Sequence, residues 1–293
     1  MRAAESVAAT HGPDPRRRAV TGGPEGAPVD AEPRAPGPEA GIPADNAMIA
    51  DAAAPGNDPL DAPSLRVGGV VPFSTTDWPG RLAAVVFVQG CPWRCGYCHN
   101  PHLIPAQGPR EESWQDILGW LDTRRGLLDA VVFSGGEPTV QPALPAAIRA
   151  VRAKGFAIGL HTGGAYPRRL TEIAADLDWV GLDIKAPAAD YIAVTRVSAS
   201  GIPAFASLDL LLRSAVALEV RTTVHPALTP PEALARLAGE LAERGVARWV
   251  LQPFRATGCA DPELVATAPL GAAIAPALLA RLRALVPGTV VRG

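Results

Sequence analysis

The sequence predicts an α/β fold in which parallel strands form a partial (β/α)6 barrel behind a disordered N-terminal extension. From residue 65 onward, six short segments rich in Val, Ile and Leu alternate with amphipathic stretches. This alternation is typical of a parallel sheet covered by helices, and right-handed crossovers curl such a sheet towards a barrel. The expected strands are residues 83–89, 129–134, 156–161, 178–185, 218–224 and 247–253.

Amphipathic patterns of helical period occupy the gaps between these strands. At 113–125, Ser113 suits the N-cap position, and apolar residues from Trp114 to Leu121 recur on one face. The other expected helices are residues 142–154, 167–177, 207–216 and 231–244.

Residues 1–64 differ in composition from the rest of the chain. They contain no aromatic residue but 11 prolines and 16 alanines, and acidic residues outnumber basic ones by ten to five. Such a segment buries too little apolar surface to offset the entropy lost on ordering. We therefore expect a disordered, Ala/Pro-rich extension at 1–64 and one folded domain at 65–293. The extension is either dispensable, or translation truly starts at Met48.

Charge and cysteine content narrow the functional class. The chain holds 27 basic and 29 acidic residues, a net charge of −2, so nucleic acid is not an expected partner. No apolar run is long enough to span a bilayer or to act as a secretory signal, which predicts no membrane partner and a cytoplasmic, reducing setting. Four cysteines, three of them within eight residues, favour a metal site over disulfides.

Cys91, Cys95 and Cys98 form a C-x3-C-x2-C motif in the string GCPWRCGYCHN, directly after the first expected strand. Three thiolates on one short loop can bind three irons of a [4Fe–4S] cubane and leave the fourth iron without a protein ligand. A structural zinc site is the alternative, for which His99 or Cys259 could supply the fourth ligand. Otherwise Cys259 is a spare thiol.

Other unusual residues also fall at the C-terminal ends of the expected strands. In a TIM-like barrel this end carries the active site, because the loops that follow the strands converge there. The strand-end groups are Ser134 to Pro138, His161 to Gly164, Asp183 to Lys185, Arg221 to His225 and Gln252 to Arg255.

The cysteine loop, with Tyr97 just before its last cysteine, and the Gly-Gly-Glu-Pro motif at 135–138 resemble the radical S-adenosylmethionine (SAM) superfamily. The wider string STTDWPGRLAAVVFVQGCPWRCGYCHNPHLIP resembles the activating enzymes of glycyl radical enzymes. Among these it is most similar to the anaerobic ribonucleoside-triphosphate reductase activating proteins. The resemblance covers roughly residues 66–255, most of the expected radical SAM domain at 65–293.

The resemblance implies an oxidoreductase with two cofactors, a [4Fe–4S] cluster and SAM. Reductive cleavage of SAM would give methionine and a 5′-deoxyadenosyl radical, which would abstract a hydrogen atom from a backbone glycine of a partner. The implied partners are a glycyl radical enzyme, by resemblance anaerobic ribonucleotide reductase, and a reductant such as flavodoxin or ferredoxin. The protein's own task is to bind and orient the reactants and to exclude competing reactions.

Gly135, Gly136 and Glu137 follow the second expected strand. The two glycines permit close backbone approach to a ligand. The resemblance implies that this motif contacts the amino group of SAM, and Glu137 can place a carboxylate near that group. The alternative is that the motif is an ordinary strand-to-helix turn. Tyr97 and Thr162 are also expected in the SAM site.

Period-two alternation puts Asp183 and Lys185 on one face of the strand at 178–185. Lys185 is one of only two lysines beside 25 arginines, which suggests that an ammonium group is needed at this position. By resemblance both residues lie against SAM and the substrate, and we expect them to act in catalysis. A salt bridge that only holds the barrel is the alternative.

On the next expected strand, the same alternation puts Glu219, Arg221, Thr223 and His225 on one face. Arg221 or His225 is expected to meet the carboxylate or ribose of SAM. Alternatively, Glu219 and Arg221 form a pair, and His225 is a plain loop residue.

Two further positions bear on the site. His161 begins the string His-Thr-Gly-Gly where related enzymes often carry Asp-Thr-Asn-Gly, whose acid helps to bind a monovalent cation. An imidazole is a poor ligand for a hard cation, which puts a cation site in doubt.

The segment around Asp77 resembles the family's turn before the first strand. Asp77 is expected at the mouth where a protein substrate enters, or in a simple Asx-type turn.

Two other functions are compatible with the sequence. One is a radical SAM enzyme that acts on a small molecule or a ribosomal peptide, although such enzymes often carry extra segments or clusters that this chain lacks. The other is a zinc- or cluster-binding module without catalysis. Activation of a glycyl radical enzyme is the leading hypothesis, because a compact chain leaves a half-open barrel for a loop of the partner.

Overall fold

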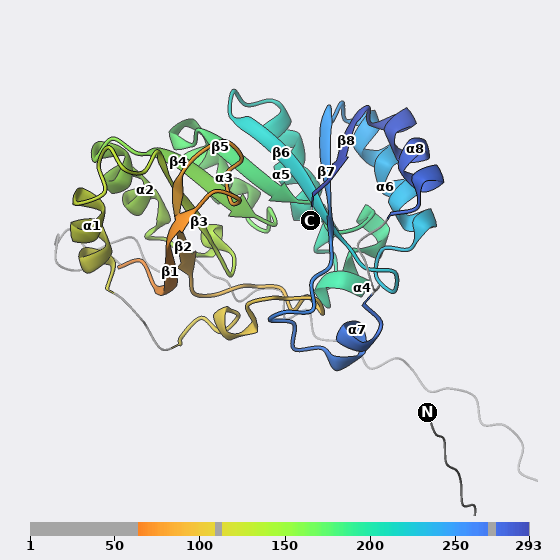
Figure 1. The fold of residues 1–293 in the computed structure, drawn as a ribbon, viewed down its shortest axis with the longest axis horizontal. Helices are drawn as coiled ribbons and strands as arrows, with labels where there is room; N and C mark the ends of the chain where they lie inside the picture. The colour runs from red at the N-terminus through yellow and green to blue at the C-terminus, as the bar shows by residue number, and fades with distance from the viewer. Residues whose placement is uncertain (1–63, 109–112, 269–273, 293) are drawn as a thin grey trace, which may run out of the picture. The chain divides into compact units, whose positions relative to one another are not determined.

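The computed structural model describes residues 64–108, 113–268 and 274–292. In this part of the chain, eight strands form one sheet in the order β1 to β8, with β1 antiparallel to β2 and every later pair parallel (Figure 1). The strands are β1 Val67–Ser74, β2 Ala83–Val88, β3 Ala130–Gly135, β4 Ala157–Thr162, β5 Trp179–Asp183, β6 Ala217–Val224, β7 Arg248–Pro253 and β8 Gly288–Val291.

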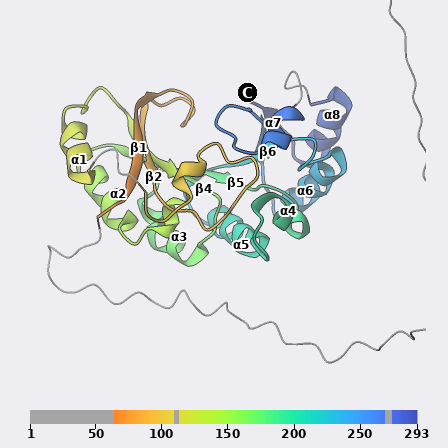
Figure 2. The same ribbon diagram turned by 90° about the horizontal axis from the view of Figure 1, so that it is seen from below.

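Helices connect the parallel strands and follow an arc along the outside of the sheet, as Figure 2 shows for α1, α2, α3, α5, α6 and α8. None of the described helices is long and apolar enough to cross a membrane. The α-helices are α1 Trp114–Asp122, α2 Leu144–Ala153, α3 Pro167–Ile173, α4 Tyr191–Thr195, α5 Gly201–Leu212, α6 Pro231–Glu243, α7 Pro262–Ala266 and α8 Pro276–Leu285. Short 3-10 helices lie at Pro101–Leu103, Pro138–Val140, Ala174–Asp176 and Ala188–Asp190.

The predicted parallel α/β sheet is confirmed, and the six expected strands are β2 to β7, each within two residues at either end. The prediction lacks β1, whose glycine pair and proline interrupt the strand pattern, and β8, which has only four residues. It also lacks α4, α7 and α8, and it begins α5 six residues late. The extension predicted at 1–64 lies outside the described residues except for Ser64.

The main hydrophobic core lies between the sheet and its outer helices. On β3, Val131 and Phe133 point into this core, while Ala130 and Val132 belong to a second cluster on the other face. All four are fully buried. Burial on both faces explains why the parallel strands are continuous apolar runs in the sequence.

The second cluster closes the interior of the partial barrel at the N-terminal ends of its strands. Trp78, from the turn between β1 and β2, stacks on Trp179 with ring centroids 5.5 Å apart. Gly159 provides the space, because a Cβ there would lie 2.9 Å from the Trp78 indole. The free space inside the barrel is therefore confined to the C-terminal half of the strands.

The barrel is open on one side. Among the described strands, β1 pairs only with β2 and β8 only with β7, so the sheet has two edges that do not meet. The sheet is thus the partial barrel that the sequence predicts, extended by one strand at each edge.

Candidate active site

The cysteine loop runs from the end of β2 to the 3-10 helix that starts at Pro101, and backbone hydrogen bonds fix its course. Cys91 N donates to Ile104 O over 3.0 Å. Further along, Arg94 N donates to Thr195 O over 2.9 Å, which docks the loop on the end of α4. The loop is therefore held by contacts on two sides.

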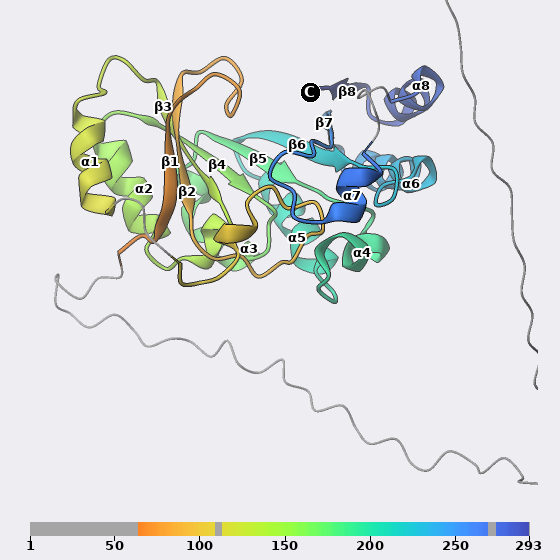
Figure 3. The ribbon, with the colours of Figure 1, turned by 60° about the horizontal axis from the view of Figure 1, so that its bottom comes forward.

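The segment after β7 packs against the same loop (Figure 3). Cys259 Sγ lies 3.5 Å from Gly96 O, and Arg196 Nη2, beside the loop, lies 2.7 Å from Asp261 Oδ2. Cys259 is therefore a packing contact of the loop and does not face the cavity that the other three cysteines line.

Cys91, Cys95 and Cys98 open onto a cavity of about 200 Å³, termed here the inner cavity. Its opposite wall is formed by the C-terminal ends of β3, β4, β5 and β6. Every residue predicted for the site except His225 lines this cavity. The lining comprises Cys91, Trp93, Cys95, Tyr97, Cys98, His99, Asn100, Ser134, Gly135, Gly136, Glu137, His161, Thr162, Gly163, Asp183, Lys185, Arg221 and Thr223.

Glu137 is only 2% exposed, and both of its carboxylate oxygens accept hydrogen bonds from the protein. Oε1 accepts from Thr139 Oγ1 (2.6 Å) and N (3.1 Å) and from Thr162 Oγ1 (2.7 Å). Oε2 accepts from Gly163 N (2.9 Å). The carboxylate thus ties the end of β3 to the end of β4, and only Oε2, with a single donor, retains capacity for an ammonium group.

Gly135 and Gly136 are required by the packing of the chain itself. A Cβ on Gly135 would lie 2.4 Å from Val88 N, and a Cβ on Gly136 would lie 2.2 Å from Gly90 O. Gly135 also has a φ of +110°, which strains any residue with a side chain. The close backbone approach expected of these glycines is therefore made to the end of β2 and the start of the cysteine loop.

Trp93, between the first two cysteines, occupies the space beside Gly163. A Cβ on Gly163 would lie 2.2 Å from the indole Cζ3 atom. The indole is 4% exposed and meets the Tyr191 ring edge-on, with centroids 6.0 Å apart. The sequence analysis missed Trp93, because a lone aromatic residue in a loop gives no periodic signal.

The three thiols of the loop are held in a partly buried setting. Burial, together with the nearby Glu137 carboxylate, raises the pKa of Cys91 to about 12, and burial also raises the pKa of Cys95 and of Cys98. Thiols must lose their protons to act as ligands, so a positively charged centre has to bind for all three to ligate.

The arrangement of these thiols fits a cluster better than a single ion. Within the described ranges, no three His, Cys, Asp or Glu side chains lie close enough together to share one metal ion. Zinc takes four ligands that converge on one point, whereas each iron of a cubane takes its own thiolate.

Asp183 lies between two cations at the end of β5. Its Oδ1 is 2.9 Å from Arg221 Nε, and its Oδ2 is 3.6 Å from Lys185 Nζ. Burial alone would raise the pKa of Asp183, but the charges of Arg221 and Lys185 outweigh burial and hold the pKa below its usual value. Asp183 is therefore an anion whose nearer partner is Arg221.

The ammonium of Lys185 lies over two aromatic rings of the cysteine loop. Its Nζ is 5.7 Å from the ring centroid of Trp93 and 5.6 Å from that of Tyr97. Burial would lower the pKa of Lys185, but the facing Asp183 carboxylate favours the charged form, and the pKa lies above the usual value. The ammonium of Lys185 is therefore fixed between the cysteine loop and β5.

His225 does not reach the cavity. Its Nδ1 accepts from Ala227 N (3.2 Å), so Nε2 carries the proton and donates to Leu264 O (3.0 Å). The ring is fully buried. β6 ends at Val224, so the alternation that predicts His225 beside Arg221 no longer applies.

Glu219 pairs with two arginines outside its own strand. Its carboxylate lies 2.5 Å from Arg292 Nη2 and 3.5 Å from Arg248 Nη2. The alternative in which Glu219 pairs with Arg221 is therefore wrong. Arg292 could not be foreseen as a site residue, because it follows β8, which is absent from the predicted strands.

His161 joins β4 to the turn between β1 and β2. One ring nitrogen, Nε2, hydrogen-bonds to Asp77 O over 2.7 Å, and the other, Nδ1, to Ser134 Oγ over 3.2 Å. The Asp77 carboxylate accepts from Ser74 Oγ over 2.5 Å in a local turn. Both nitrogens of the imidazole therefore have protein partners.

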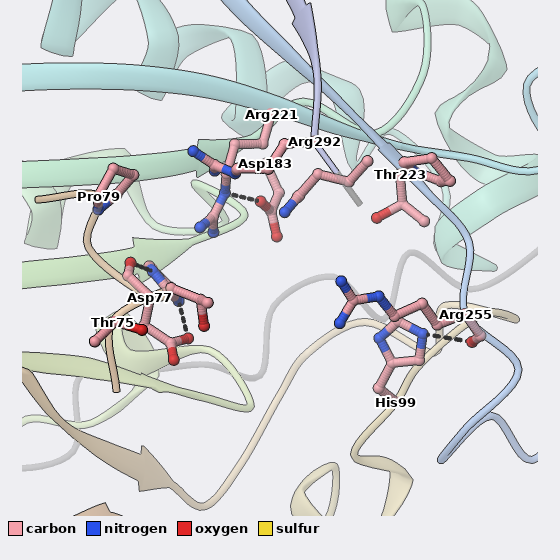
Figure 4. A pocket seen from close by; sticks show the side chains of 13 residues that line it. Thr75, Asp77, Pro79, His99, Asp183, Arg221, Thr223, Arg255 and Arg292 are labelled. Atoms are coloured by element: carbon pink, nitrogen blue, oxygen red, sulfur yellow. Dashed lines mark hydrogen bonds and ion pairs between the residues drawn. The ribbon is translucent and has the colours of Figure 1, made fainter. Parts of the chain in front are cut away.

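A second cavity of about 500 Å³, termed the outer cavity, adjoins the inner one and is drawn in Figure 4. His99, His161, Asp183, Arg221 and Thr223 line both. The outer cavity lies between the turn after β1 and the residues that follow β7 and β8, near both edges of the sheet. Its further lining residues are Thr75, Thr76, Asp77, Pro79, Gln252, Pro253, Arg255 and Arg292.

The family model of the radical SAM superfamily matches residues 85–237, more than half of the chain. The chain belongs to the radical SAM superfamily. A candidate glycyl-radical enzyme activating enzyme of Methanocaldococcus jannaschii is 29% identical over 204 residues, which cover 67% of this chain and 83% of that protein. The pyruvate formate-lyase-activating enzyme of Clostridium pasteurianum is 30% identical over 201 residues, 66% of this chain and 83% of that enzyme. Within the superfamily, the chain therefore groups with the glycyl-radical-enzyme activating enzymes.

Among solved structures, Streptococcus suis SuiB bound to precursor peptide SuiA matches with a TM-score of 0.52 at 14% identity, over 71% of this chain and 48% of that one. At this identity the likeness concerns the fold alone. Family membership makes the protein a radical SAM oxidoreductase whose cofactors are a [4Fe–4S] cluster and SAM, and the C-x3-C-x2-C motif agrees with it.

We expect Gly136→Ala to displace the cysteine loop, because the new Cβ would collide with the Gly90 carbonyl. Iron content after anaerobic reconstitution should fall, together with the melting temperature. Gly119→Ala is the matched control: its Cβ meets no atom within 4 Å, and alanine favours a helix over glycine by about 0.5–1 kcal/mol. Full iron content and wild-type melting in Gly136→Ala would contradict the packing argument.

His161 should make the fold sensitive to mild acid. Burial and the nearby Arg221 lower its pKa to about 4, below the usual 6.5. The unfolded chain therefore binds the proton more readily, so stability is present above pH 6.5 and is lost as the pH falls towards 4, on the order of 2–3 kcal/mol. Urea unfolding at pH 7 and 4.5 should show a smaller loss for His161→Gln than for the wild type. An equal loss in both proteins would rule this out.

Proposed function

We propose that this enzyme generates a glycyl radical on anaerobic ribonucleoside-triphosphate reductase by removing a hydrogen atom from a backbone glycine. The observation that carries the proposal is the pair of adjoining cavities. The inner one holds the cysteines and the charged residues of β5 and β6, and the outer one reaches the open side of the barrel. Such an arrangement suits a reactant that is part of another protein, because a loop of that protein can enter from the open side.

In this proposal Cys91, Cys95 and Cys98 hold the [4Fe–4S] cluster at the wall of the inner cavity. A reduced cluster bound there would supply the electron that cleaves SAM into methionine and a 5′-deoxyadenosyl radical. The residues around the cavity bind and orient SAM and limit the access of water. Tyr97 lies on the cysteine loop itself, and Gly135, Gly136 and Thr162 line the opposite wall.

Charge complementarity supports separate roles for the polar residues. The free lone pair of Glu137 Oε2 suits the amino group of SAM. Lys185, fixed over two aromatic rings, suits its carboxylate, and Arg221 holds Asp183 in a position to accept from a ribose hydroxyl. These assignments make Asp183 and Lys185 the catalytic contacts and Arg221 a binding contact; they leave out His225.

The choice of partner rests on the similarity of the segment around the cysteine loop to the activating proteins of this reductase. We further propose that flavodoxin or ferredoxin is the reductant, that the enzyme works in the cytoplasm, and that residues 65–293 are the catalytic domain. A radical SAM reaction on a small molecule or peptide is the competing function, and the experiment below separates the two.

The proposal predicts a glycyl radical in the partner. Reduced enzyme, SAM and anaerobic ribonucleotide reductase from the same organism should be combined without oxygen, and the radical should be measured by electron paramagnetic resonance. A doublet that collapses when the glycines carry deuterium is the expected result. Cys95→Ala, which lacks one thiolate, should bind less iron and give no signal. Formation of 5′-deoxyadenosine without any glycyl radical would favour the competing function.

Lys185→Met should separate catalysis from stability. Asp183 keeps its contact with Arg221 in this variant, so we expect wild-type iron content and melting temperature but strongly reduced 5′-deoxyadenosine formation. Asp183→Asn leaves both cations without their carboxylate and should cost roughly 1–3 kcal/mol, less than a fully buried pair because the Asp183 side chain is 36% exposed.

The chain's other lysine provides the control for this comparison. Lys154 pairs with Asp122, and neither residue lines the inner or the outer cavity. Lys154→Met removes the same group and should leave 5′-deoxyadenosine formation unchanged. Wild-type activity of Lys185→Met would remove Lys185 from the catalytic contacts.

A further inference from the structure

Lys185 lies beyond the end of the strand that leads to it. β5 ends at Asp183, and its pairing with β6 ends there, opposite Arg221. One further backbone hydrogen bond joins Ile184 N to Arg221 O over 2.9 Å. Strand pairing therefore does not fix the backbone of Lys185. Its position must be set by a residue outside the sheet.

Tyr191, the first residue of α4, makes that contact. Its hydroxyl accepts a hydrogen bond from Lys185 N over 3.0 Å, and this is the only hydrogen bond of Lys185 N within the described residues. The Tyr191 side chain is 1% exposed. A buried hydroxyl is costly unless it is hydrogen-bonded, so the bond to Lys185 N is what makes a tyrosine suitable here.

The ring of Tyr191 also supports the aromatic surface on which the ammonium lies. It meets Trp93 edge-on with centroids 6.0 Å apart, and Trp93 is one of the two rings that face Lys185 Nζ. Phe205, on α5, packs edge-on against the Tyr191 ring with centroids 6.1 Å apart. Tyr191 therefore contacts both the backbone of Lys185 and a ring that faces its ammonium.

The ammonium of Lys185 is held short of the protein's own carboxylate. Its Nζ lies 3.6 Å from Asp183 Oδ2, whereas Nζ of the other lysine, Lys154, lies 2.6 Å from Asp122 Oδ2. A hydrogen-bonded ion pair measures about 2.7–2.9 Å, so the contact with Asp183 is too long for one. Because Lys185 lines the inner cavity, its N–H donors are available to a ligand there.

We propose that Tyr191 is a positioning residue, which holds Lys185 so that its ammonium stays apart from Asp183 and faces the carboxylate of SAM. Tyr191 lines neither the inner nor the outer cavity, so it acts through Lys185 and not by touching a reactant. The inference rests on the proposed function, in which Lys185 binds that carboxylate. Without the hydroxyl, Lys185 N loses its partner and the ammonium can close on Asp183.

Binding of SAM should be measured by anaerobic equilibrium dialysis with cluster-loaded, unreduced enzyme. Tyr191→Phe removes one oxygen atom and should weaken the binding of SAM about fivefold, the effect of one ordinary hydrogen bond, with unchanged iron content. Decarboxylated SAM lacks the group that Lys185 binds, so it should bind to the variant and to the wild type equally. Equal weakening of both ligands would indicate a merely structural role and overturn the inference.

Tyr166→Phe is the matched control, because the Tyr166 hydroxyl makes no hydrogen bond with a described residue and the side chain lines neither the inner nor the outer cavity. This variant should bind SAM like the wild type. In a Lys185→Met background, Tyr191→Phe should cause no further loss of SAM affinity, because a positioning residue acts only through the residue that it positions. A fivefold loss that persists without Lys185 contradicts the proposal.

Trp93→Phe provides a second route if Tyr191→Phe does not fold. It reduces the ring that lies between Tyr191 and the ammonium and leaves the hydroxyl in place. SAM affinity should fall only while Lys185 is present. An equal loss with and without Lys185, or no loss at all, overturns the inference.

The single variants separate this inference from the proposed function. If Lys185→Met binds SAM as tightly as the wild type, the assignment of Lys185 to the carboxylate is wrong, and the positioning role falls with it. If Lys185→Met weakens SAM binding and Tyr191→Phe does not, the assignment stands and only the positioning role is overturned. The glycyl radical signal tests the partner independently of both.

Discussion

The buried carboxylate of Glu137 is the constraint on which the geometry of this site depends. It accepts hydrogen bonds from the turn after β3 and from the end of β4, so the two strand ends cannot move independently. The same turn is joined to the cysteine loop, because Glu137 N donates to Gly90 O over 2.8 Å and Gly136 leaves no space between the two backbones. Three thiols that must fit one rigid cluster need such support, since a small shift of the loop would separate them.

The interior of the partial barrel is filled at one end of the strands and open to ligands at the other. The stacked tryptophans at 78 and 179 fill the N-terminal half of the strands, so ligands are confined to the C-terminal half. There, the cluster loop closes one side, and the separated edges β1 and β8 leave the other open. Charged side chains are paired towards the cysteine loop, and residues that end or follow β7 and β8 line the opening. One chain can thereby shield a reactive small molecule and still admit part of a larger one.

Much of this arrangement can be predicted from the sequence. The six central strands follow from apolar runs, because parallel strands buried on both faces must be apolar throughout. The site residues follow from their positions at strand ends, which brings Asp183, Lys185 and Arg221 to one cavity. Prediction of site residues from the sequence fails where tertiary contacts determine the position of a side chain. His225 lies one residue beyond the strand, so the alternation used for it had already ended. Trp93 and Arg292 act through contacts with residues far away in the chain, and no local pattern marks them.

The contact between Trp93 and Gly163 couples two positions that are 70 residues apart. The indole occupies the volume that a side chain at 163 would need, so the two sites share one fixed amount of space. A larger residue at 163 requires that the indole move or that position 93 carry a smaller residue, so a substitution at 163 is favoured after one at 93. The string His-Thr-Gly-Gly is therefore tied to the tryptophan of the cysteine loop, and the history of one motif constrains that of the other.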